Sequence, residues 1–363
     1  MKTNKITLMQ YIFLIHGVQV GVGLLTLPRE LAEKAGTDGW ISIIIAWIVT
    51  TAVSLIIIQV MKKRPDGTIL DLVTYYFGKW VGKAATILFA LYFAALGNLI
   101  FIREAIFIQA WILPRTELYI FILLLSLPTY LIVKNNITVL GRYSELVFFI
   151  TIWILIVYLI PLNYANWLHL LPVVKEGWLP IVSSIRTTIF SFIGFEVAFF
   201  LYPFLHKKEK ASLGIVIANT ITMLSLLMIT LVVYLFFSPD EITVFNEPAI
   251  VILKIIEFTF VERLEIIIFS YYIFVISTTV LPLIFFTVYC TSQLFGKQDH
   301  SRHLLLFLIL QFLIVLLIPP TVERNAILRE GMNVVSFVFA FVFPICIWVY
   351  VSLHGVLKRG IKK

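Results

Sequence analysis

Glycine and polar residues interrupt two long apolar segments of this chain, and these residues are well suited to bind a small ligand. The first segment carries three glycines and a glutamine between His16 and Leu24, and the second carries Ser191, Gly194 and Glu196. Each mid-helix glycine costs about 1 kcal/mol relative to alanine, so clustered glycines predict that the helix is broken there. A broken helix leaves backbone N–H and C=O groups free, and half-helix N-termini favour a carboxylate. An amino acid would place its carboxylate on the N–H groups and its ammonium on the carbonyl oxygens.

The sequence therefore predicts one ligand site built from both interruptions. A second interpretation is that the glycines only let a neighbouring helix pack closely, as small residues often do in membranes. The residues predicted to bind the ligand at the interruptions are Gln19, Val20, Gly21, Val22, Gly23, Leu24, Ser191, Phe192, Ile193, Gly194, Phe195 and Glu196.

Glu196, Arg103 and Glu104 are ionisable residues inside apolar segments, where a charge costs at least about 2.5 kcal/mol and is a functional candidate. Glu196 either titrates with transport or meets a substrate cation, or it is a buried acid that fixes helix packing. Arg103 and Glu104 point about 100° apart on a helix, so each is expected to find a partner on another helix. They form either a structural ion-pair network on the outer side or an outer gate along the access path.

Further polar side chains are expected to face the interior of the protein. Asn98 and Tyr272 are assigned to the ligand site, and Ser277 and Thr278 to coupling or gating. The hydroxyl groups would complete a cation site with carbonyl oxygens of the first interruption. The alternative is that they bond back to their own helix, as hydroxyls within membrane helices commonly do.

Signatures of catalysis and metal binding are missing from the sequence. It contains no Gly-x-Ser-x-Gly, no His-Glu-x-x-His and no phosphate-binding Gly-Lys-Ser/Thr loop. His16 has no second His or Cys at metal-ligand spacing, so neither a metal nor another cofactor is expected. Cys290 and Cys346 form no disulfide or metal pattern. The chain is predicted not to be an enzyme, and any transport must be secondary or passive.

The elements that position these residues are apolar helices. The chain has 363 residues, 61% hydrophobic and 13% charged, whereas a soluble domain carries about 25% charged residues. Its mean hydropathy is +1.01. The apolar runs are continuous and of spanning length, which predicts an all-α integral membrane protein and excludes a barrel. Ten transmembrane helices are predicted, over about 8–34, 39–61, 83–111, 118–134, 143–161, 182–206, 211–237, 262–293, 303–320 and 332–356.

Charge placement orients the predicted spans. Most of the 28 Lys and Arg residues lie in the ends and loops on the N-terminal side. The other side carries ten acidic residues, which are Glu30, Glu33, Asp38, Glu117, Glu176, Asp240, Glu241, Glu247, Glu323 and Glu330. The positive-inside rule then places both termini in the cytoplasm. The net charge of +8 faces the anionic headgroups of the lipid bilayer, which removes the case for a nucleic-acid partner.

The two interruptions lie about half the chain apart, in the first and sixth predicted spans. Broken helices in corresponding positions of two halves are expected of transporters with inverted repeats. We therefore predict a single domain over 1–363 with a five-plus-five inverted repeat. The first repeat covers about 8–161 and the second about 182–356.

Short motifs along the whole chain resemble the B-type subunit of bacterial spore germinant receptors. They are Gly21-Val22-Gly23-Leu24-Leu25-Thr26-Leu27-Pro28-Arg29 followed by Asp38-Gly39-Trp40, then Gly78-Lys79-Trp80-Val81-Gly82, Phe192-Ile193-Gly194-Phe195-Glu196 and Val261-Glu262-Arg263. The core of the first motif, Gly-x-Gly followed by an apolar run and Pro, is shared with amino acid/polyamine/organocation permeases.

The resemblance implies a permease fold in the inner membrane of the spore, beside a larger A-type membrane subunit and a C-type lipoprotein subunit. It implies that the chain senses small germinants such as amino acids, sometimes sugars or nucleosides. The substrate site of the permeases corresponds to Val20 to Leu24 and Ser191 to Phe195 here. The basic residue that some proton-coupled relatives carry in the fifth segment is absent from 143–161, which offers only Glu145.

Three functions are compatible with these features. The first is a germinant-binding receptor subunit that signals through a difference in ligand affinity between two states. The second is a secondary amino-acid transporter, because it needs the same site. The third is a passive pore for ions or small molecules.

Overall fold

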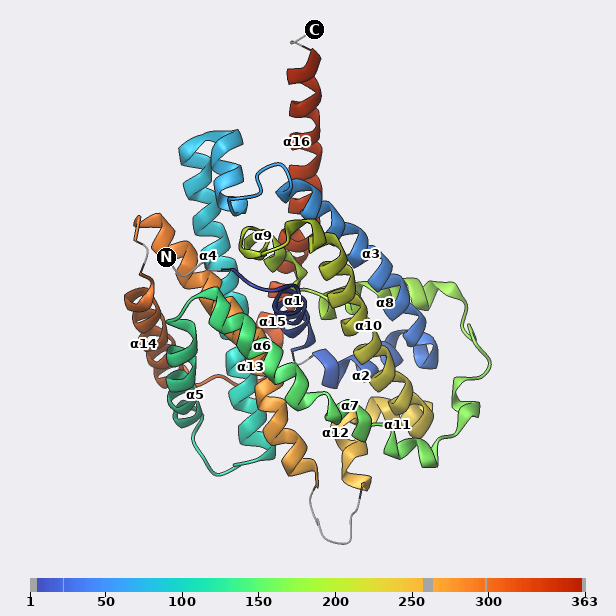
Figure 1. Ribbon diagram of the computed structural model, residues 1–363. Helices are drawn as coiled ribbons and strands as arrows, with labels where there is room; N and C mark the ends of the chain where they lie inside the picture. Colours follow the sequence, from blue (N-terminus) through green and yellow to red (C-terminus); the bar gives the residue numbers. More distant parts are fainter. Residues whose placement is uncertain (1–4, 22, 257–263, 298, 361–363) are drawn as a thin grey trace.

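Helices make up the regular structure of the protein (Figure 1). The computed structural model describes residues 5–21, 23–256, 264–297 and 299–360, with side chains described up to residue 354. Among these residues, one isolated backbone bridge joins Ile6 to Leu205. The α-helices are α1 (Leu8–Val20), α2 (Gly23–Ala35), α3 (Gly39–Met61), α4 (Ile69–Trp111), α5 (Leu118–Val133), α6 (Ile137–Thr151), α7 (Trp153–Val157), α8 (Trp178–Ser191), α9 (Ala198–Leu201), α10 (Ala211–Phe236), α11 (Pro239–Val244), α12 (Pro248–Val251), α13 (Leu264–Leu294), α14 (Ser301–Leu317), α15 (Val322–Phe337) and α16 (Phe343–Gly360). Short 3-10 helices cover Gly36–Asp38, Ile160–Tyr164, Trp167–Leu170, Phe195–Val197, Tyr202–Phe204, Lys208–Lys210 and Ile252–Ile255, and a π-helical turn covers Val338–Val342.

Several helices are long and apolar enough to cross a membrane. Within the described residues there are six, and a bent pair formed by Trp178–Ser191 and Phe195–Phe204 raises the number to seven. Three further apolar helices, Leu8–Val20, Leu118–Val133 and Ser301–Leu317, are shorter. The all-α, multi-pass prediction is therefore confirmed, while the count of ten stays a prediction.

Two predicted spans begin too late in the sequence. Helix α6 begins at Ile137 instead of residue 143, capped by Asn136, and the last apolar span begins at Val322 instead of residue 332. Helix α4 begins at Ile69 and is kinked at Gly78 (φ 86°), but its spanning part, Lys79–Trp111, begins close to the predicted residue 83. Because α6 begins early, it contains a basic residue outside the predicted span, Arg142, whose side chain is exposed.

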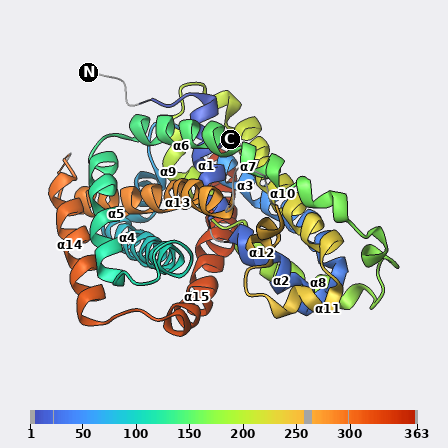
Figure 2. The same ribbon diagram turned by 90° about the horizontal axis from the view of Figure 1, so that it is seen from below.

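The helices form two groups with α1 between them. Seen from below, α4, α5, α13 and α14 lie on one side, and α2, α3, α8 and α10 on the other (Figure 2). Helix α13 packs along α4 and α14 on α5, while α3 packs on α8 and α10. Helix α1 contacts both α10 and α13. The interrupted segment that follows α1 is therefore positioned between the two groups.

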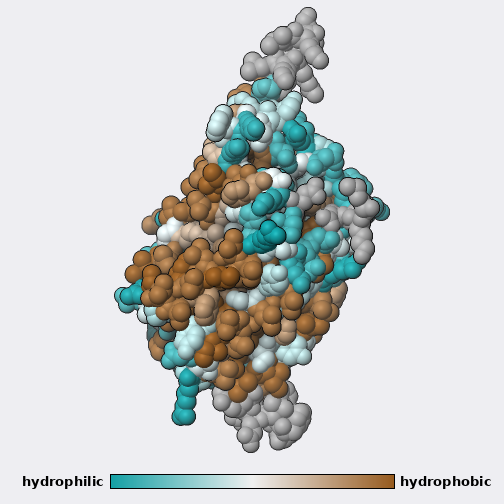
Figure 3. Space-filling view, turned by 90° about the vertical axis from the view of Figure 1, so that its left-hand side faces the viewer, coloured by the Kyte–Doolittle hydropathy of each residue, from teal (hydrophilic) through white to brown (hydrophobic). Residues whose placement is uncertain are grey.

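A belt of apolar side chains covers the face formed by α5 and α14 (Figure 3). Leu124 and Leu127 of α5 are 62% and 65% exposed, and Leu306 and Leu310 of α14 are 67% and 58% exposed. Hydrophilic residues gather towards the end from which the C-terminus projects (Figure 3). Such a broad apolar surface needs a nonaqueous partner, and the lipid bilayer supplies it.

Asp38 ties the long connection between α7 and α8 to the start of α3. Its buried carboxylate accepts hydrogen bonds from the backbone N–H groups of Val174 and Lys175, at 2.9 and 3.0 Å. Val174 has a positive φ of 61°, which is a strained conformation for a β-branched residue. The two bonds to one carboxylate therefore hold a strained loop in place.

We expect Asp38→Ala to release this loop and to destabilise the protein by about 2 to 4 kcal/mol, since hydrogen bonds to a charged group contribute about 1.5 to 3 kcal/mol each. Asp38→Asn keeps one acceptor oxygen and should lose roughly half as much. Unfolding midpoints and protease cleavage within 171–177 measure the effect. Asp240→Ala, at an exposed residue, is the control and should change neither.

Candidate functional site

The first interruption separates α1 from α2. Helix α1 ends at Val20, Gly21 takes a non-helical conformation (φ 21°, ψ −146°), and α2 begins at Gly23. Glycine is suited to this position because it has no Cβ that would disfavour a positive φ. Val22, which was predicted to bind the ligand, lies outside the described residues, as do motif residues 261–263.

The second interruption follows α8. That helix ends at Ser191, Gly194 has a φ of 127°, and the chain continues as the 3-10 helix Phe195–Val197. The helical pieces on either side are bent by 46°. The φ of Gly194 lies where side chains are rarely tolerated, so this position also requires glycine.

The two interruptions pack against each other. A Cβ atom added to Gly194 would lie only 2.8 Å from Val18 Cγ1 and 2.9 Å from the Val18 carbonyl carbon. A Cβ atom added to Gly23 would lie 3.2 Å from Ser191 Oγ. The structure thus brings together two segments that the sequence separates by half the chain, with glycine at the points of closest approach.

Backbone carbonyl oxygens at the first interruption already have side-chain partners. The Tyr272 hydroxyl donates to the Gly21 carbonyl oxygen at 2.7 Å. The Thr279 hydroxyl donates to the Gly17 carbonyl oxygen at 2.7 Å. Helix α13 therefore supports the first interruption, and Tyr272 lies where it was predicted to contribute.

Gln19 links the first interruption to the second. Its Nε2 donates to the Phe192 carbonyl oxygen at 3.0 Å and to Asn219 Oδ1 at 2.8 Å. Its Oε1 accepts from the Thr222 hydroxyl at 2.8 Å, and His16 Nδ1 lies 2.9 Å from the same hydroxyl oxygen. Asn219 and Thr222 were not among the residues predicted from the sequence. Their spacing of three residues within the apolar run of α10 is the signal that identifies a polar face.

Glu196 lies at the second interruption and accepts a hydrogen bond from its backbone. Its side chain is 0% exposed, and its Oε2 accepts from the Gly194 N–H at 2.8 Å. The Tyr92 hydroxyl of α4 donates to its Oε1 at 2.6 Å. The Tyr92 ring stacks on Phe339 of the π-helical turn, with ring centroids 4.4 Å apart. Glu196 is thus a hydrogen-bonded, buried acid, and Tyr92 is a partner that the sequence analysis did not find.

Ser277 and Asn98 have other surroundings, whereas Thr278 packs against Gly17 of the first segment. The Ser277 hydroxyl lies 2.6 Å from the Tyr143 hydroxyl of α6, and the Thr278 hydroxyl donates to the Val275 carbonyl oxygen of its own helix at 2.6 Å. Asn98 lies on α4, and within the described part of the chain its Oδ1 is buried without a hydrogen-bond partner. Among the described residues, Thr279 supplies the shorter hydroxyl bond to Gly17, since Thr278 is 3.5 Å from that oxygen.

The remaining predicted residues, Arg103 and Glu104, behave differently from each other. Arg103 forms an ion pair with Glu247 just before α12, with 2.6 Å between Nη2 and Oε1, and the Trp111 indole donates to the other oxygen at 2.9 Å. Glu104 is 1% exposed, and its Oε1 has no hydrogen-bond partner among the described residues. Within the part of the chain that the structure describes, a partner is thus present for Arg103 and not for Glu104 Oε1, and the Arg103 partner precedes a helix instead of lying within one.

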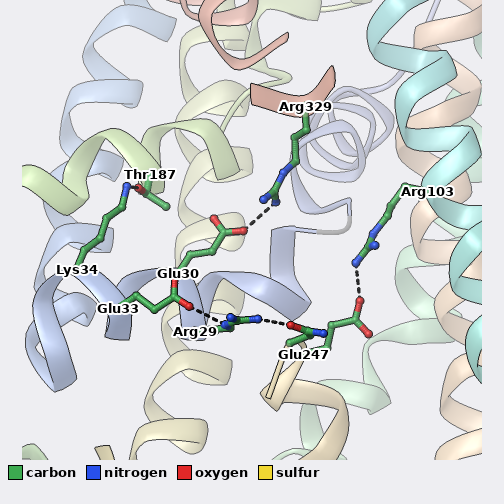
Figure 4. Close-up of polar contacts among 9 residues, drawn as sticks. Arg29, Glu30, Glu33, Lys34, Arg103, Thr187, Glu247 and Arg329 are labelled. Atoms are coloured by element: carbon green, nitrogen blue, oxygen red, sulfur yellow. Dashed lines mark hydrogen bonds and ion pairs between the residues drawn. The ribbon is translucent and has the colours of Figure 1, made fainter. Parts of the chain in front are cut away.

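Further polar contacts at the same end join α2 to other elements (Figure 4). Arg329 of α15 pairs with Glu30 of α2 at 2.8 Å. Arg29 pairs with Glu33 at 2.7 Å and also donates to Asn246. Helix α2, which begins at the first interruption, is therefore tied to α15 and to the segment before α12. No group of three or more metal-binding side chains occurs among the described residues.

The sequence of the chain matches a known protein family. A family model described as "Spore germination protein" matches residues 5–325. The chain is 26% identical to spore germination protein GerQB of Bacillus cereus over 96% of both chains. It is 25% identical to spore germination protein YndE of Bacillus subtilis (strain 168) over 99% of both chains.

Solved structures share the fold. A Na+-coupled sialic acid symporter in a substrate-bound outward-open state superposes with a TM-score of 0.65 at 9% identity, covering 93% of this chain and 80% of that one. MhsT in complex with L-phenylalanine gives 0.58 at 12% identity, covering 92% and 87%. These similar proteins are not enzymes, in agreement with the sequence prediction. The chain therefore belongs to the spore germination protein family, as its motifs predicted, and is a multi-pass membrane protein with a transporter-like fold.

Proposed function

We propose that this protein is a germinant receptor subunit that binds a small germinant, with amino-acid character, where its two interruptions meet. The observation that carries the proposal is the contact of Gly194 with Val18 and of Gln19 with Phe192. Free or exchangeable backbone groups at such a junction suit a small zwitterion. The ligand site comprises 19–24 and 191–196 together with Tyr272 of α13 and Asn98 of α4.

The membrane arrangement completes the proposal. Ten spans form a five-plus-five inverted repeat over about 8–161 and 182–356, with spans one and six broken. Six long helices, one bent pair and three shorter apolar helices support this count. The protein lies in the spore inner membrane with both termini in the cytoplasm, and signals through A-type and C-type partner subunits. The family membership and the charge asymmetry of the sequence support these assignments.

Binding and uptake measurements on one preparation separate a receptor from a transporter. We expect one or a few of the twenty common L-amino acids to raise the unfolding temperature of the purified chain in lipid nanodiscs, because a ligand that binds only the native state stabilises it. In proteoliposomes the same amino acid should not accumulate. Accumulation against a gradient would support the secondary transporter instead. Failure of all amino acids to bind would refute the proposed ligand class.

The outer ion pair is proposed to act as a gate. Arg103 belongs to α4, and Glu247 lies beside the segment that Arg29 of α2 also contacts. An ion pair across this junction favours the closed arrangement. Because its side chains are 24% and 11% exposed, it should contribute more than a fully exposed pair.

We expect a double-mutant cycle with Arg103→Ala and Glu247→Ala to give a coupling energy of about 1 to 2 kcal/mol. The exposed pair Arg29 and Glu33 is the matched control and should give about 0.3 to 0.5 kcal/mol. Arg103→Ala should also shift the germinant concentration that gives half-maximal response. A coupling energy no larger than that of the control pair, with an unchanged response, would remove the gate from the proposal.

A further inference from the structure

The Gln19 side chain occupies a backbone acceptor that the proposed ligand needs. Phe192 is the first residue beyond α8, and its carbonyl oxygen accepts from Gln19 Nε2 at 3.0 Å. The Gln19 side chain is only 4% exposed. In this structure an amide N–H therefore stands where an ammonium group would bind.

Surrounding residues hold the Gln19 amide in this orientation. Its second N–H faces Asn219 Oδ1 at 2.8 Å, and its oxygen faces the Thr222 hydroxyl at 2.8 Å. Asn219 is itself oriented, because its Nδ2 donates to Ser54 Oγ at 3.0 Å. Reversing the Gln19 amide would place its oxygen against two acceptors, the Phe192 carbonyl oxygen and Asn219 Oδ1. Residues of α3 and α10 therefore hold the Gln19 N–H in its orientation towards the Phe192 carbonyl oxygen.

The nearby carbonyl oxygen of Gly21 is taken as well, by the Tyr272 hydroxyl at 2.7 Å. A ligand that enters between the interruptions must therefore displace a donor from the protein. Gln19 is a neutral donor, whereas an ammonium group forms the stronger, charge-assisted bond to a carbonyl oxygen. The hydroxyl groups of a sugar or nucleoside would gain nothing in such an exchange, because they are neutral donors too.

We propose that Gln19 is a tethered competitor of the ligand's ammonium group for the Phe192 carbonyl oxygen. Binding exchanges the amide for the ammonium, which selects amino acids and other primary amines over sugars and nucleosides. The exchange also breaks the hydrogen bond that joins the two interruptions, so an occupied site differs structurally from an empty one. This inference rests on the proposed function, and it fixes the ligand class and a positioning role for Asn219 and Thr222.

The proposal predicts that removing the Gln19 donor strengthens ligand binding. Gln19→Met keeps the side-chain length and removes the donor, so the amino acid that stabilises the native chain should bind about three- to tenfold more tightly. A residue that contacts the ligand directly would weaken binding when replaced, and that result would overturn the proposal. Gln10→Met is the matched control, because Gln10 lies on the same helix, is 7% exposed and bonds to Glu145. The Gln10→Met variant should bind the amino acid with the same affinity as the unmodified chain.

A second variant guards against a folding defect. Gln19→Leu also removes the donor and adds no charge, so it should tighten amino-acid binding as well. Weaker binding in both variants would show that Gln19 holds the ligand instead of competing with it.

A readout without ligand separates this inference from the proposed function. Ser191→Cys, in a chain carrying Cys346→Ser, places a thiol beside the junction while the native Cys290 stays buried. Loss of the Gln19–Phe192 bond should speed its labelling by a small cationic methanethiosulfonate about threefold or more. An unchanged labelling rate in Gln19→Met would overturn the inference. Faster labelling without any amino-acid ligand would support Gln19 as the closing bond and reject the proposed function.

Discussion

Gly194→Ala should lower the free energy of unfolding by roughly 2 to 6 kcal/mol and abolish the germinant response. Part of the cost is backbone strain, about 1 to 3 kcal/mol, because the φ of 127° is unfavourable for any residue with a Cβ. The rest is a collision with the Val18 backbone at 2.9 Å, and overpacking of this kind costs about 1 to 3 kcal/mol. Relief of the collision would separate the two interruptions. Unfolding in mixed micelles with increasing SDS measures the stability term.

Gly177→Ala is the matched control for strain without collision. Gly177 also has a positive φ, 85°, but nothing lies within 4 Å of the position that its Cβ would take. Gly177→Ala should therefore lower the free energy of unfolding only by the backbone strain and leave the germinant response intact. Equal costs for the two variants would contradict the close contact between the interruptions.

Glu196→Leu should destabilise the protein by roughly 2 to 5 kcal/mol. It leaves two buried donors, the Gly194 N–H and the Tyr92 hydroxyl, without their acceptors, and each unsatisfied buried group costs about 1 to 3 kcal/mol. Glu196→Gln retains one acceptor oxygen and should lose about half as much. The same mixed-micelle unfolding measurement applies.

Tyr92→Phe provides the internal control for this prediction. Without the Tyr92 hydroxyl, Glu196→Leu leaves one buried donor unsatisfied instead of two. The double variant should therefore be destabilised by about 1 kcal/mol less than the sum of the two single variants. Strict additivity would contradict the Tyr92–Glu196 hydrogen bond. The result matters for function because this bond connects the second interruption to α4 and, through Phe339, to the π-helical turn.

Local signals predicted the interruptions themselves. Gly21, Gly23 and Gly194 are recognisable because glycine is costly inside a helix wherever it stands, and Tyr272 and Gln19 are polar residues in otherwise apolar segments. The relation between the two interruptions followed from their similar places in the two halves. All of this can be read from residue type and position along the chain.

Partners across helices could not be predicted in the same way. A membrane helix that is apolar on most sides does not reveal which face meets which neighbour. Asn219 and Thr222 were therefore not identified, and the contact of Ser277 with Tyr143 was not predicted. The start of α6 was misplaced because its cap, Asn136, precedes the apolar run.

Binding of the stabilising amino acid to Gly194→Trp in nanodiscs is the most direct test of a ligand site between the two interruptions. The indole cannot fit beside Val18, where even a Cβ atom would collide, so it would separate the two interruptions. We predict at least about a hundredfold loss of affinity, measured by isothermal titration on the folded fraction. Gly177→Trp, in open surroundings, should bind as the unmodified chain does. Affinity retained within twofold in Gly194→Trp would contradict the account and move the site elsewhere.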